Sequence, residues 1–566
     1  MEQNVLTTSY SSDMDKALPL SQYPRPTLRR DSYLCLNGEW DFDISESAEN
    51  IKTNKKILVP FPPESRLSGY GKEIPEGSLM HYKRTFSLPE GFLKGRVILH
   101  FGAVDTLCEV FINGRLAAKN EGGYIPFSID ITELLEEENE LRVVVRDNLD
   151  KAYPYGKQTR SRGGMWYTPV SGIWQTVWLE SVPASYIRSL KITPSLDSVK
   201  IEVTGGEDNK RLTLTESGEV FEFSGNEITI SPKTVKHWTP ETPHIYNFRI
   251  ECGDDTVESY FALREIAVKE IDGIARLCLN GEPYLFNGLL DQGYFPDGLF
   301  LPATYDGYRD DILLAKSMGF NMLRKHIKVE PEIFYYLCDT LGIAVFQDMV
   351  NNSDYSFFFD TALPTIGIKS ISDKHRHKNP RSRAIFEREM YKTLDHLYNF
   401  PSIVYYTVFN EGWGQFCADE MYKKAKVHDG TRIYDATSGW FTEKESDVDS
   451  RHVYFKTVKL GRRGKRPIVI SEFGGYSHRV KGHLFGDKNY GYRTFNNIAD
   501  FEDAFIRLYE GEIEPLVPLG VSALVYTQLS DVEDETNGIV TYDRLVVKLN
   551  SEKIRPMMER IKSKIL

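Results

Sequence analysis

Two glutamates lie at or near the ends of apolar runs that have the pattern of buried strands. Residues 403–411 read Ile-Val-Tyr-Tyr-Thr-Val-Phe-Asn-Glu, and residues 467–473 read Pro-Ile-Val-Ile-Ser-Glu-Phe. Apolar and β-branched runs of this length are typical of strands that are buried on both faces. A carboxylate at the end of such a strand is costly unless it is paired or used in chemistry. We therefore take Glu411 and Glu472 as candidate catalytic carboxylates.

A pair of carboxylates is what glycoside hydrolysis requires. One protonated carboxyl group donates to the departing oxygen, while an ionised carboxylate attacks the anomeric carbon. The retaining mechanism needs the two groups about 5–5.5 Å apart, and the inverting mechanism needs about 6.5–9.5 Å. The alternative is that Glu411 and Glu472 are ion-paired or surface carboxylates on strand ends.

The elements that must position these glutamates follow from the change of pattern after about Lys269. From there strand-like and helix-like runs alternate, which is the mark of βα units around a parallel sheet. Roughly 300 residues with eight such repeats predict a (β/α)8 TIM barrel over residues 269–566, with its site at the carboxyl ends of the strands. The predicted strands are Tyr284–Leu290, Asn321–His326, Ile343–Asp348, Ile403–Asn410, Arg432–Ala436, His452–Phe455, Pro467–Phe473 and Ala523–Gln528. The predicted helices are Tyr305–Met318, Glu332–Leu341, Ala384–Tyr398 and Trp413–Val427.

Two β units are predicted before the barrel. Residues 1–182 contain short strands such as Arg96–Phe101, and Asn113-Gly114 is a strong signal for a hairpin turn. This pattern predicts a jelly-roll β-sandwich. Residues 183–268 contain further alternating strands in a segment whose size fits a small immunoglobulin-like sandwich. We therefore expect a multidomain chain with two β-sandwiches followed by a barrel.

Composition excludes several classes of partner. The net charge of −12 argues against nucleic acid, because phosphate binding needs a clustered positive field. The 6 cysteines are far apart and without metal-binding spacing, so they are expected to be reduced thiols. Residues 1–20 lack the apolar core of a signal peptide, and no apolar run reaches the roughly 18 residues that span a bilayer. We therefore expect a cytoplasmic protein with no membrane partner.

Motifs along nearly the whole chain form a recognisable series. They are Pro24–Thr27, Leu36–Phe42, His81–Phe86, Gly172–Val177, Trp238–Pro243, and Asn410-Glu411 with Glu472. Together they resemble glycoside hydrolase family 2, the family of β-galactosidases, β-glucuronidases and β-mannosidases. The resemblance implies an exo-acting retaining β-glycosidase in which Glu411 is the acid/base and Glu472 is the nucleophile.

The resemblance also implies roles for four further residues. Arg324 matches a family arginine at the barrel mouth, where it can orient a carboxylate, although an ion pair with Asp348 or Glu411 is an equal alternative. Asn410 would bond the 2-hydroxyl of the sugar, Tyr454 would hold the nucleophile, and Trp413 would be either a stacking wall or a core residue. The remaining strand-end candidates for substrate binding are His326, Asp291, Gln292, Asp348 and Tyr526.

Departures from the family pattern bear on the sugar. Residues 324–331 read Arg-Lys-His-Ile-Lys-Val-Glu-Pro, where β-galactosidases usually have Ser-His-Tyr-Pro after the arginine. Residues 346–349, Phe-Gln-Asp-Met, are closer to the Trp-Gln-Asp of the β-mannosidase branch, and the Asn-x-Lys signature of glucuronidases is not evident near Asn537. We expect a β-galactosidase-like enzyme, with β-mannosidase or another β-glycosidase specificity as the alternative and glucuronidase least favoured.

The expected partner is an oligosaccharide or glycoside, and the chain is a possible homo-oligomer by resemblance to the family. No cofactor is expected to be required and no metal ligand set is evident, so Mg²⁺ is suggested by the family resemblance only. Two other functions remain open, a non-catalytic carbohydrate-binding homologue and a transglycosylase. The loop of residues 349–383 is too long for a plain connection and would be either a solvated flap or a lid.

Overall fold

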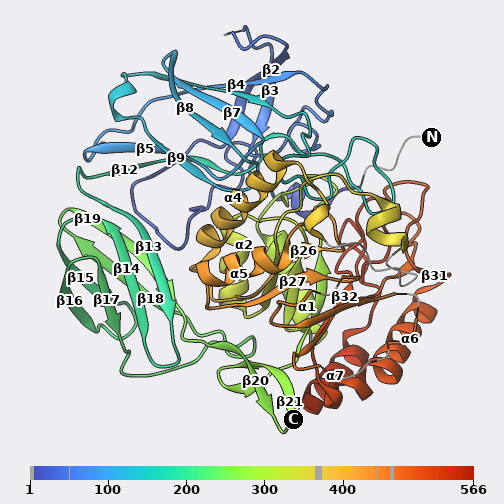
Figure 1. Ribbon diagram of the computed structural model, residues 1–566. Coiled ribbons are helices and arrows are strands. Elements are labelled where there is room, and N and C mark those ends of the chain that lie inside the picture. Colours follow the sequence, from blue (N-terminus) through green and yellow to red (C-terminus); the bar gives the residue numbers. More distant parts are fainter. Residues whose placement is uncertain are drawn as a thin grey trace.

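The computed structural model describes residues 6–49, 51–363, 373–441, 443–454, 456–458, 460 and 464–565. Two β regions and a barrel follow one another along the chain, and the first β region lies above the barrel with the second at its side (Figure 1). Phe455, the last residue of the predicted sixth strand, lies outside the described residues. Within the described residues, no helix is both long and apolar enough to cross a membrane.

The first β region consists of two antiparallel sheets that pack their apolar faces together. The alternating burial of Leu107–Ile112 places Cys108, Val110 and Ile112 in this core, as the period of a half-buried strand requires. The predicted turn is confirmed, because Asn113 and Gly114 have φ of 51° and 77° between two paired strands. The smaller sheet has β1 (Tyr33–Cys35), β12 (Val177–Val182), β5 (Arg96–Phe101) and β9 (Phe127–Asp130), in that order. The larger has β3 (Lys55–Val59), β2 (Gly38–Ser45), β4 (Leu79–Phe86), β10 (Asn139–Arg146), β7 (Leu107–Ile112) and β8 (Arg115–Glu121), and β11 (Gly172–Ile173) pairs with β6 (Val104–Asp105).

The second β region is a smaller sandwich, tied to the first by a buried arginine. Arg30 donates to Glu180 of β12 at 3.2 Å and to Asp255 of the second region at 2.8 Å. One sheet has β13 (Ile187–Pro194), β14 (Val199–Gly205) and β17 (Glu227–Ile230). The other has β16 (Val220–Ser224), β15 (Asn209–Leu214), β18 (Tyr246–Cys252) and β19 (Asp255–Phe261). These are the short alternating strands that the sequence predicts.

A small sheet that the sequence analysis did not foresee precedes the barrel. It contains β20 (Ile266–Ile271), β21 (Ile274–Leu279) and β22 (Glu282–Pro283), at the bottom of the view in Figure 1. Leu277 and Leu279 share one buried cluster with Trp238 and with barrel residues such as Val525. The apolar side of this sheet therefore closes the end of the barrel opposite the strand ends that carry the predicted site.

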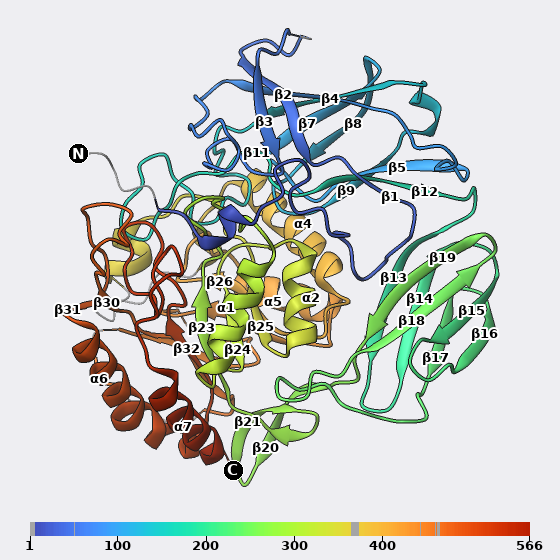
Figure 2. The same cartoon turned by 180° about the vertical axis from the view of Figure 1, so that it is seen from behind.

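The barrel itself is confirmed as a parallel sheet of eight strands that is nearly closed. Its strands are β27 (Ile433–Ser438), β26 (Ile403–Asn410), β25 (Ala344–Asp348), β24 (Met322–Lys325), β23 (Phe286–Asp291), β32 (Val521–Thr527), β29 (Ile468–Gly474) and β28 (Asp449–Val453), in order around the sheet. All eight overlap the predicted strands, and the sixth begins three residues earlier than expected. Helices surround this sheet, as both views show (Figures 1 and 2).

Four of the covering helices match the predicted ones in position. The later start of α5 has a local cause, because residues 411–414 form a turn at the barrel mouth before the helix begins. The helices are α1 (Asp306–Ser317), α2 (Glu332–Leu341), α4 (Pro380–Leu397), α5 (Ala418–His428), α6 (Ile498–Leu508) and α7 (Ser551–Lys562). Beyond β29, the short strands β30 (Tyr476–His478) and β31 (Arg493–Phe495) pair in parallel.

Strand β26 is buried on both faces, as its sequence predicts. The ring of Tyr405 stacks on Phe346 inside the barrel, with 4.1 Å between the ring centroids. On the outer side Phe409 stacks on Phe386 of α4 at 4.8 Å. An apolar strand enclosed in this way has little freedom to move, so the residues at its end are held firmly.

Candidate active site

The carboxyl ends of β26 and β29 bring Glu411 and Glu472 close together. His452 lies between them, with its Nδ1 2.8 Å from Oε1 of Glu411 and 3.5 Å from Oε2 of Glu472. One ligand-type atom from each of these three residues lies within 4.8 Å of the others. Oxygen atoms this near to each other fit the closer spacing of the retaining mechanism better than the wider spacing of the inverting one.

The backbone turn after β26 aims Glu411 into this space. Glu411 and Gly412 have φ of 53° and 75°, and the amide of Trp413 donates to the carbonyl of Asn410 at 3.0 Å. A Cβ on Gly412 would lie 2.3 Å from the ring of Phe441, so only glycine fits there. Glu411 itself adopts the left-handed conformation, which costs a non-glycine residue about 1–2 kcal/mol. Such local strain at a polar strand end is common where a side chain is positioned for function.

Glu472 has a donor on each carboxylate oxygen. Arg324 donates to Oε1 at 3.0 Å, and the hydroxyl of Tyr454 donates to Oε2. Burial opposes ionisation of Glu472, but its interactions with His452, Arg324 and His326 and the hydrogen bond from Tyr454 outweigh burial and lower its pKa. Glu472 is therefore held as an anion, the state that a nucleophile needs.

The two glutamates differ in their access to solvent. The side chain of Glu411 is 14% exposed, whereas that of Glu472 is 6% exposed and lies deeper in the barrel. A group that first protonates a departing oxygen and later activates water must meet both at the open side. This difference in exposure fits the expected roles, with Glu411 as acid/base and Glu472 as nucleophile, and these roles stay predictions.

Arg324 is the hub of the polar cluster beneath the glutamates. In addition to Glu472, it donates to Oδ1 of Asp348 at 3.0 Å and to Oδ1 of Asn410 at 2.9 Å. Since the amide oxygen of Asn410 accepts from Arg324, its amide nitrogen is the group left to donate toward a ligand. Of the two roles considered for Arg324, these contacts favour a structural one that orients its neighbours.

His326 and Asp348 form a buried pair beside Arg324. Nδ1 of His326 lies 2.7 Å from Oδ2 of Asp348. Burial lowers the pKa of His326 in spite of this bond. For Asp348, burial is outweighed by the charge of Arg324 and the contact with His326, which lower its pKa. These predicted residues are therefore brought to the cluster around Glu472.

Asp291, Gln292 and Tyr526 are not brought to this cluster. Asp291 accepts from Nζ of Lys325 at 2.6 Å, in a buried ion pair that also includes Glu330. Gln292 donates to Oε1 of Gln528 at 2.8 Å. These contacts give Asp291 and Gln292 structural partners in place of the expected position at a ligand.

Tyr526 points away from the barrel interior, which corrects the expectation of a substrate contact. It is in register with Leu289 and its ring lies 4.7 Å from that of Phe505 of α6. Because side chains alternate along a strand, the next residue, Thr527, faces inward instead. Its hydroxyl oxygen lies 3.1 Å from that of Tyr454.

Trp413 belongs to an aromatic cluster at the rim that joins the barrel to the first β region. Its ring lies 5.4 Å from Tyr155, 5.0 Å from Trp166 and 6.0 Å from Tyr355. Trp413 is only 3% exposed, so of its two predicted roles core packing fits better. Trp166, which is only partly buried, is the more accessible ring of this cluster.

Several residues near the site were missed by the sequence analysis. The ring of Tyr492 stacks on Tyr454 with 3.9 Å between centroids, and Tyr167 from the first β region donates to the buried carboxylate of Glu535. These contacts join segments far apart in the chain, and no local pattern signals them. His452 could have been found, because it lies two residues before Tyr454 on the predicted strand His452–Phe455, where residues two apart face the same side.

The loop of residues 349–383 is described only in part. Tyr355 lies in the rim cluster, whereas Phe357, Phe358 and Phe359 are exposed. Arg376 pairs with Asp360 within the same loop. Residues 364–372 lie outside the described residues, so the choice between a flap and a lid stays a prediction.

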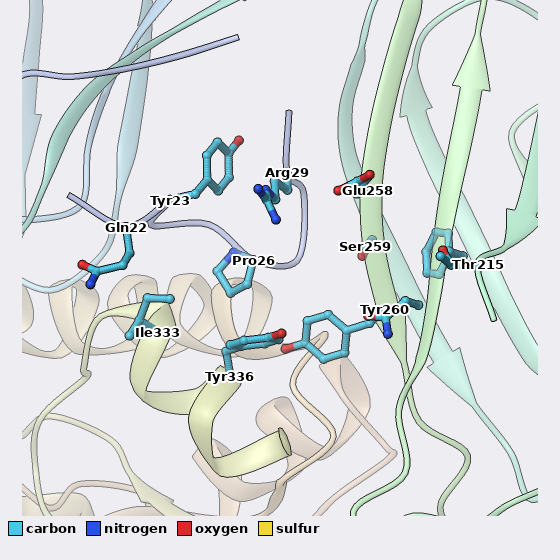
Figure 3. A pocket seen from close by; sticks show the side chains of 12 residues that line it. Gln22, Tyr23, Pro26, Arg29, Thr215, Glu258, Ser259, Tyr260, Ile333 and Tyr336 are labelled. Atoms are coloured by element: carbon cyan, nitrogen blue, oxygen red, sulfur yellow. The ribbon is translucent and has the colours of Figure 1, made fainter. Parts of the chain in front are cut away.

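A separate hollow of about 610 Å³ lies at the junction of the N-terminal segment, the second β region and α2 (Figure 3). The rings of Tyr260 and Tyr336 approach each other at its base, and Tyr23 and Arg29 line the opposite side. None of the predicted site residues lines it. The hollow is therefore distinct from the site at the barrel mouth.

Comparisons with known proteins identify the family. The model of the glycosyl hydrolase 2 galactose-binding domain-like family matches residues 74–183, and that of the glycosyl hydrolases family 2 TIM barrel domain matches residues 275–490. A β-galactosidase of Pseudoalteromonas haloplanktis is 23% identical, over 83% of this chain and 50% of its own length. A putative β-glucuronidase of Formosa agariphila is 27% identical, over 67% of this chain and 48% of its own length. The chain thus spans about half the length of the curated relatives it matches.

Solved structures share the fold. A β-glucuronidase from an uncultured Clostridium species has a TM-score of 0.75 at 19% identity, covering 94% of this chain and 99% of that one. A β-galacturonidase from Eisenbergiella tayi has a TM-score of 0.67 at 18% identity, covering 94% of this chain and 98% of that one. The two matching family models include the sandwich and the barrel that carries both glutamates, and they show that the chain belongs to glycoside hydrolase family 2.

Proposed function

We propose that this glycosidase is an exo-acting retaining enzyme that hydrolyses terminal β-linked sugars by double displacement. The observation that carries the proposal is the placement of Glu411 and Glu472, whose carboxylates face each other across His452 with atoms within 4.8 Å. Glu472 attacks the anomeric carbon as the glycosidic bond breaks, and Glu411 gives its proton to the departing oxygen. Water, deprotonated by Glu411, then releases the sugar from Glu472.

A β-galactoside is the proposed substrate. The support is the name of several curated relatives, including the β-galactosidase of Pseudoalteromonas haloplanktis, together with the lack of an Asn-x-Lys signature near Asn537. The structural neighbours named β-glucuronidase are under 25% identical, so their likeness bears on fold only. A panel of aryl β-galactoside, β-mannoside, β-glucuronide and β-glucoside distinguishes these specificities directly.

The catalytic assignment is tested by removing each carboxylate. We expect Glu472→Ala to lose at least about 10⁴-fold in kcat, because the covalent step needs the nucleophile. Azide should restore turnover in that variant and give a glycosyl azide of inverted configuration, while Glu411→Ala with azide should give the retained anomer. Product configuration is read by NMR. Wild-type turnover by Glu472→Ala would refute the assignment.

The same substrates test the rival of a non-catalytic carbohydrate-binding homologue. If the wild-type protein bound sugars but cleaved no aryl glycoside of the panel, that rival would replace the proposal. A transglycosylase would be recognised by an added sugar acceptor, in place of water, capturing the glycosyl group. The presence of both carboxylates in reacting positions supports hydrolysis over mere binding.

A further inference from the structure

His452 makes contacts that the two-carboxylate scheme does not use. Its imidazole side chain is 0% exposed and lies near the end of β28, the strand that pairs with β29. Nδ1 is the only ring nitrogen directed at the glutamates, 2.8 Å from Oε1 of Glu411 and 3.5 Å from Oε2 of Glu472. One nitrogen thus faces both reacting groups.

The ring is held so that it cannot turn away from the glutamates. Gly439 has φ of 98°, and a Cβ there would lie 2.9 Å from Nδ1 of His452, so the backbone passes directly against the imidazole. The ring of Trp440 lies 5.8 Å away at 69°. Nε2 is fixed by the hydroxyl of Ser438 at 2.8 Å. The imidazole therefore has a single orientation.

The partners of the ring decide which nitrogen carries a proton. A lone pair on Nδ1 would be repelled by the ionised carboxylate of Glu472, whereas an N–H group there is attracted to Glu472 and can donate to an oxygen of Glu411 whether or not Glu411 carries its proton. The hydroxyl of Ser438 can donate or accept, so Nε2 is satisfied in either protonation state. Tyr454 and Arg324 direct their own donors to Glu472. Nδ1–H is thus a donor to the glutamate pair.

Resting on the function proposed above, we infer that His452 is a positioning residue that supplies one N–H donor to both steps of the reaction. In the free enzyme Nδ1–H bonds to Oε1 of Glu411, so the acidic proton of Glu411 occupies the other oxygen. That proton passes to the glycosidic oxygen while the bond from Oε of Glu472 to the anomeric carbon forms. Nδ1–H stabilises the negative charge left on Glu411.

The second step reverses the distribution of charge. While Glu472 is esterified it carries no charge, so Glu411 is the only anion facing Nδ1. Glu411 then takes a proton from water as the water oxygen attacks the anomeric carbon and the ester bond breaks. Glu472 regains its negative charge and its weaker contact with Nδ1. His452 itself neither gains nor loses a proton in the cycle.

The inference predicts an effect that depends on the leaving group. For His452→Ala we expect kcat/KM to fall about 100-fold on alkyl or disaccharide substrates, which need a proton from Glu411. For 2,4-dinitrophenyl glycosides, whose leaving group needs no proton, we expect kcat/KM of His452→Ala to fall by less than about 5-fold. His452→Asn keeps an amide donor near the position of Nδ1 and should recover about 10-fold of the loss on alkyl substrates.

Two further variants separate this role from a structural one. Ser438→Ala removes only the contact that orients Nε2 of His452. Its loss in kcat/KM should depend on the leaving group in the same way as in the His452 variants, but the loss should be smaller. His428→Asn changes a partly exposed histidine of α5 that pairs with Asp395, and it should leave all rates unchanged. Thermal unfolding midpoints are measured for each variant so that a rate change is not mistaken for loss of the fold.

The outcomes discriminate between the inference and the function on which it rests. An equal loss on both leaving groups in the His452 variants overturns the inference and leaves the glycosidase function intact. If the His452 variants do not fold, a loss in Ser438→Ala that is independent of the leaving group overturns it in the same way. A wild-type protein that cleaves neither kind of substrate overturns the proposed function and this inference together.

Discussion

At the scale of single residues, the charge of Glu472 is the property that the site is built to maintain. Arg324 and Tyr454 each donate to one of its oxygens, and the charge of Arg324 is shared with Asp348. In a buried setting an unpaired carboxylate would take up a proton, because burial disfavours the charged form. The donors are therefore required for Glu472 to be a nucleophile near neutral pH.

Tyr454→Phe tests this requirement. The variant removes the hydroxyl that donates to Oε2 of Glu472, and hydrogen bonds to charged groups contribute about 1.5–3 kcal/mol. We expect kcat to fall about 10- to 100-fold. Because loss of the donor raises the lowered pKa of Glu472, the acidic limb of the profile of kcat/KM should move to higher pH.

Tyr526→Phe is the matched control for that experiment. Tyr526 has the same phenol side chain and lies on β32, which pairs with β29, the strand of Glu472. Its ring faces Phe505 and the helices. We expect its kcat and pH profile to equal those of the wild type. An unchanged acidic limb in Tyr454→Phe, or a shift of equal size in Tyr526→Phe, would contradict the role given to Tyr454.

At the scale of elements, the turn at the end of β26 determines where Glu411, the proposed acid/base, points. Its two successive left-handed residues, Glu411 and Gly412, end the strand abruptly and delay the start of α5 to Ala418. The amide of Glu411 is held by the carbonyl of Ser438 at 2.9 Å, which links the turn to β27. The position of the carboxylate thus depends on backbone geometry as much as on its own contacts.

Gly412→Ala tests the turn. The new Cβ would lie 2.3 Å from Phe441 in a backbone region that alanine avoids, so the turn must shift. Since a displacement of about 1 Å in a catalytic group can cost about 100-fold, we expect a loss of that order in kcat/KM. Gly511→Ala is the control, because a Cβ there meets nothing within 4 Å. Activity equal to that of the control would show that the turn tolerates the change.

At the scale of the whole molecule, buried charges hold the two β regions to each other. Glu180 accepts from both Arg25 and Arg30, at 2.8 and 3.2 Å. Burial raises the pKa of Glu180, but the charges of Arg25, His100 and Arg30 outweigh it and hold the pKa well below its usual range. A carboxylate with a lowered pKa contributes stability above its unfolded pKa, and that stability is lost as the pH falls through the folded pKa.

Arg30→Ala tests this junction. The substitution removes the arginine that pairs with both Glu180 and Asp255 and leaves these two carboxylates buried. Breaking a buried ion pair lowers the free energy of unfolding by about 3–5 kcal/mol. We expect the midpoint of thermal unfolding of Arg30→Ala to be lower than that of the wild type near pH 7. The difference between the two midpoints should become smaller as the pH falls below 4. Arg96→Ala removes an exposed pair with Asp130 and should change the midpoint little. Equal midpoints for the two variants would exclude the proposed role of Arg30.

The sequence by itself determined the barrel strands and four of the helices around them, because apolar periodicity and turn residues act over short distances. The runs around Glu411 and Glu472 predicted their strands, and the order of the strands placed both residues at one end of a barrel. The roles of these residues came from the family resemblance. Local pattern alone also predicted the Asn113-Gly114 turn.

Only the tertiary structure decided which side chains meet. It turned Tyr526 toward the helices, gave Asp291 to Lys325, and brought Trp166 of the first β region against Trp413. It also placed His452 between the two glutamates. These outcomes depend on strand register, on the local turn after β26 and on the docking of distant segments, and no short stretch of sequence specifies them.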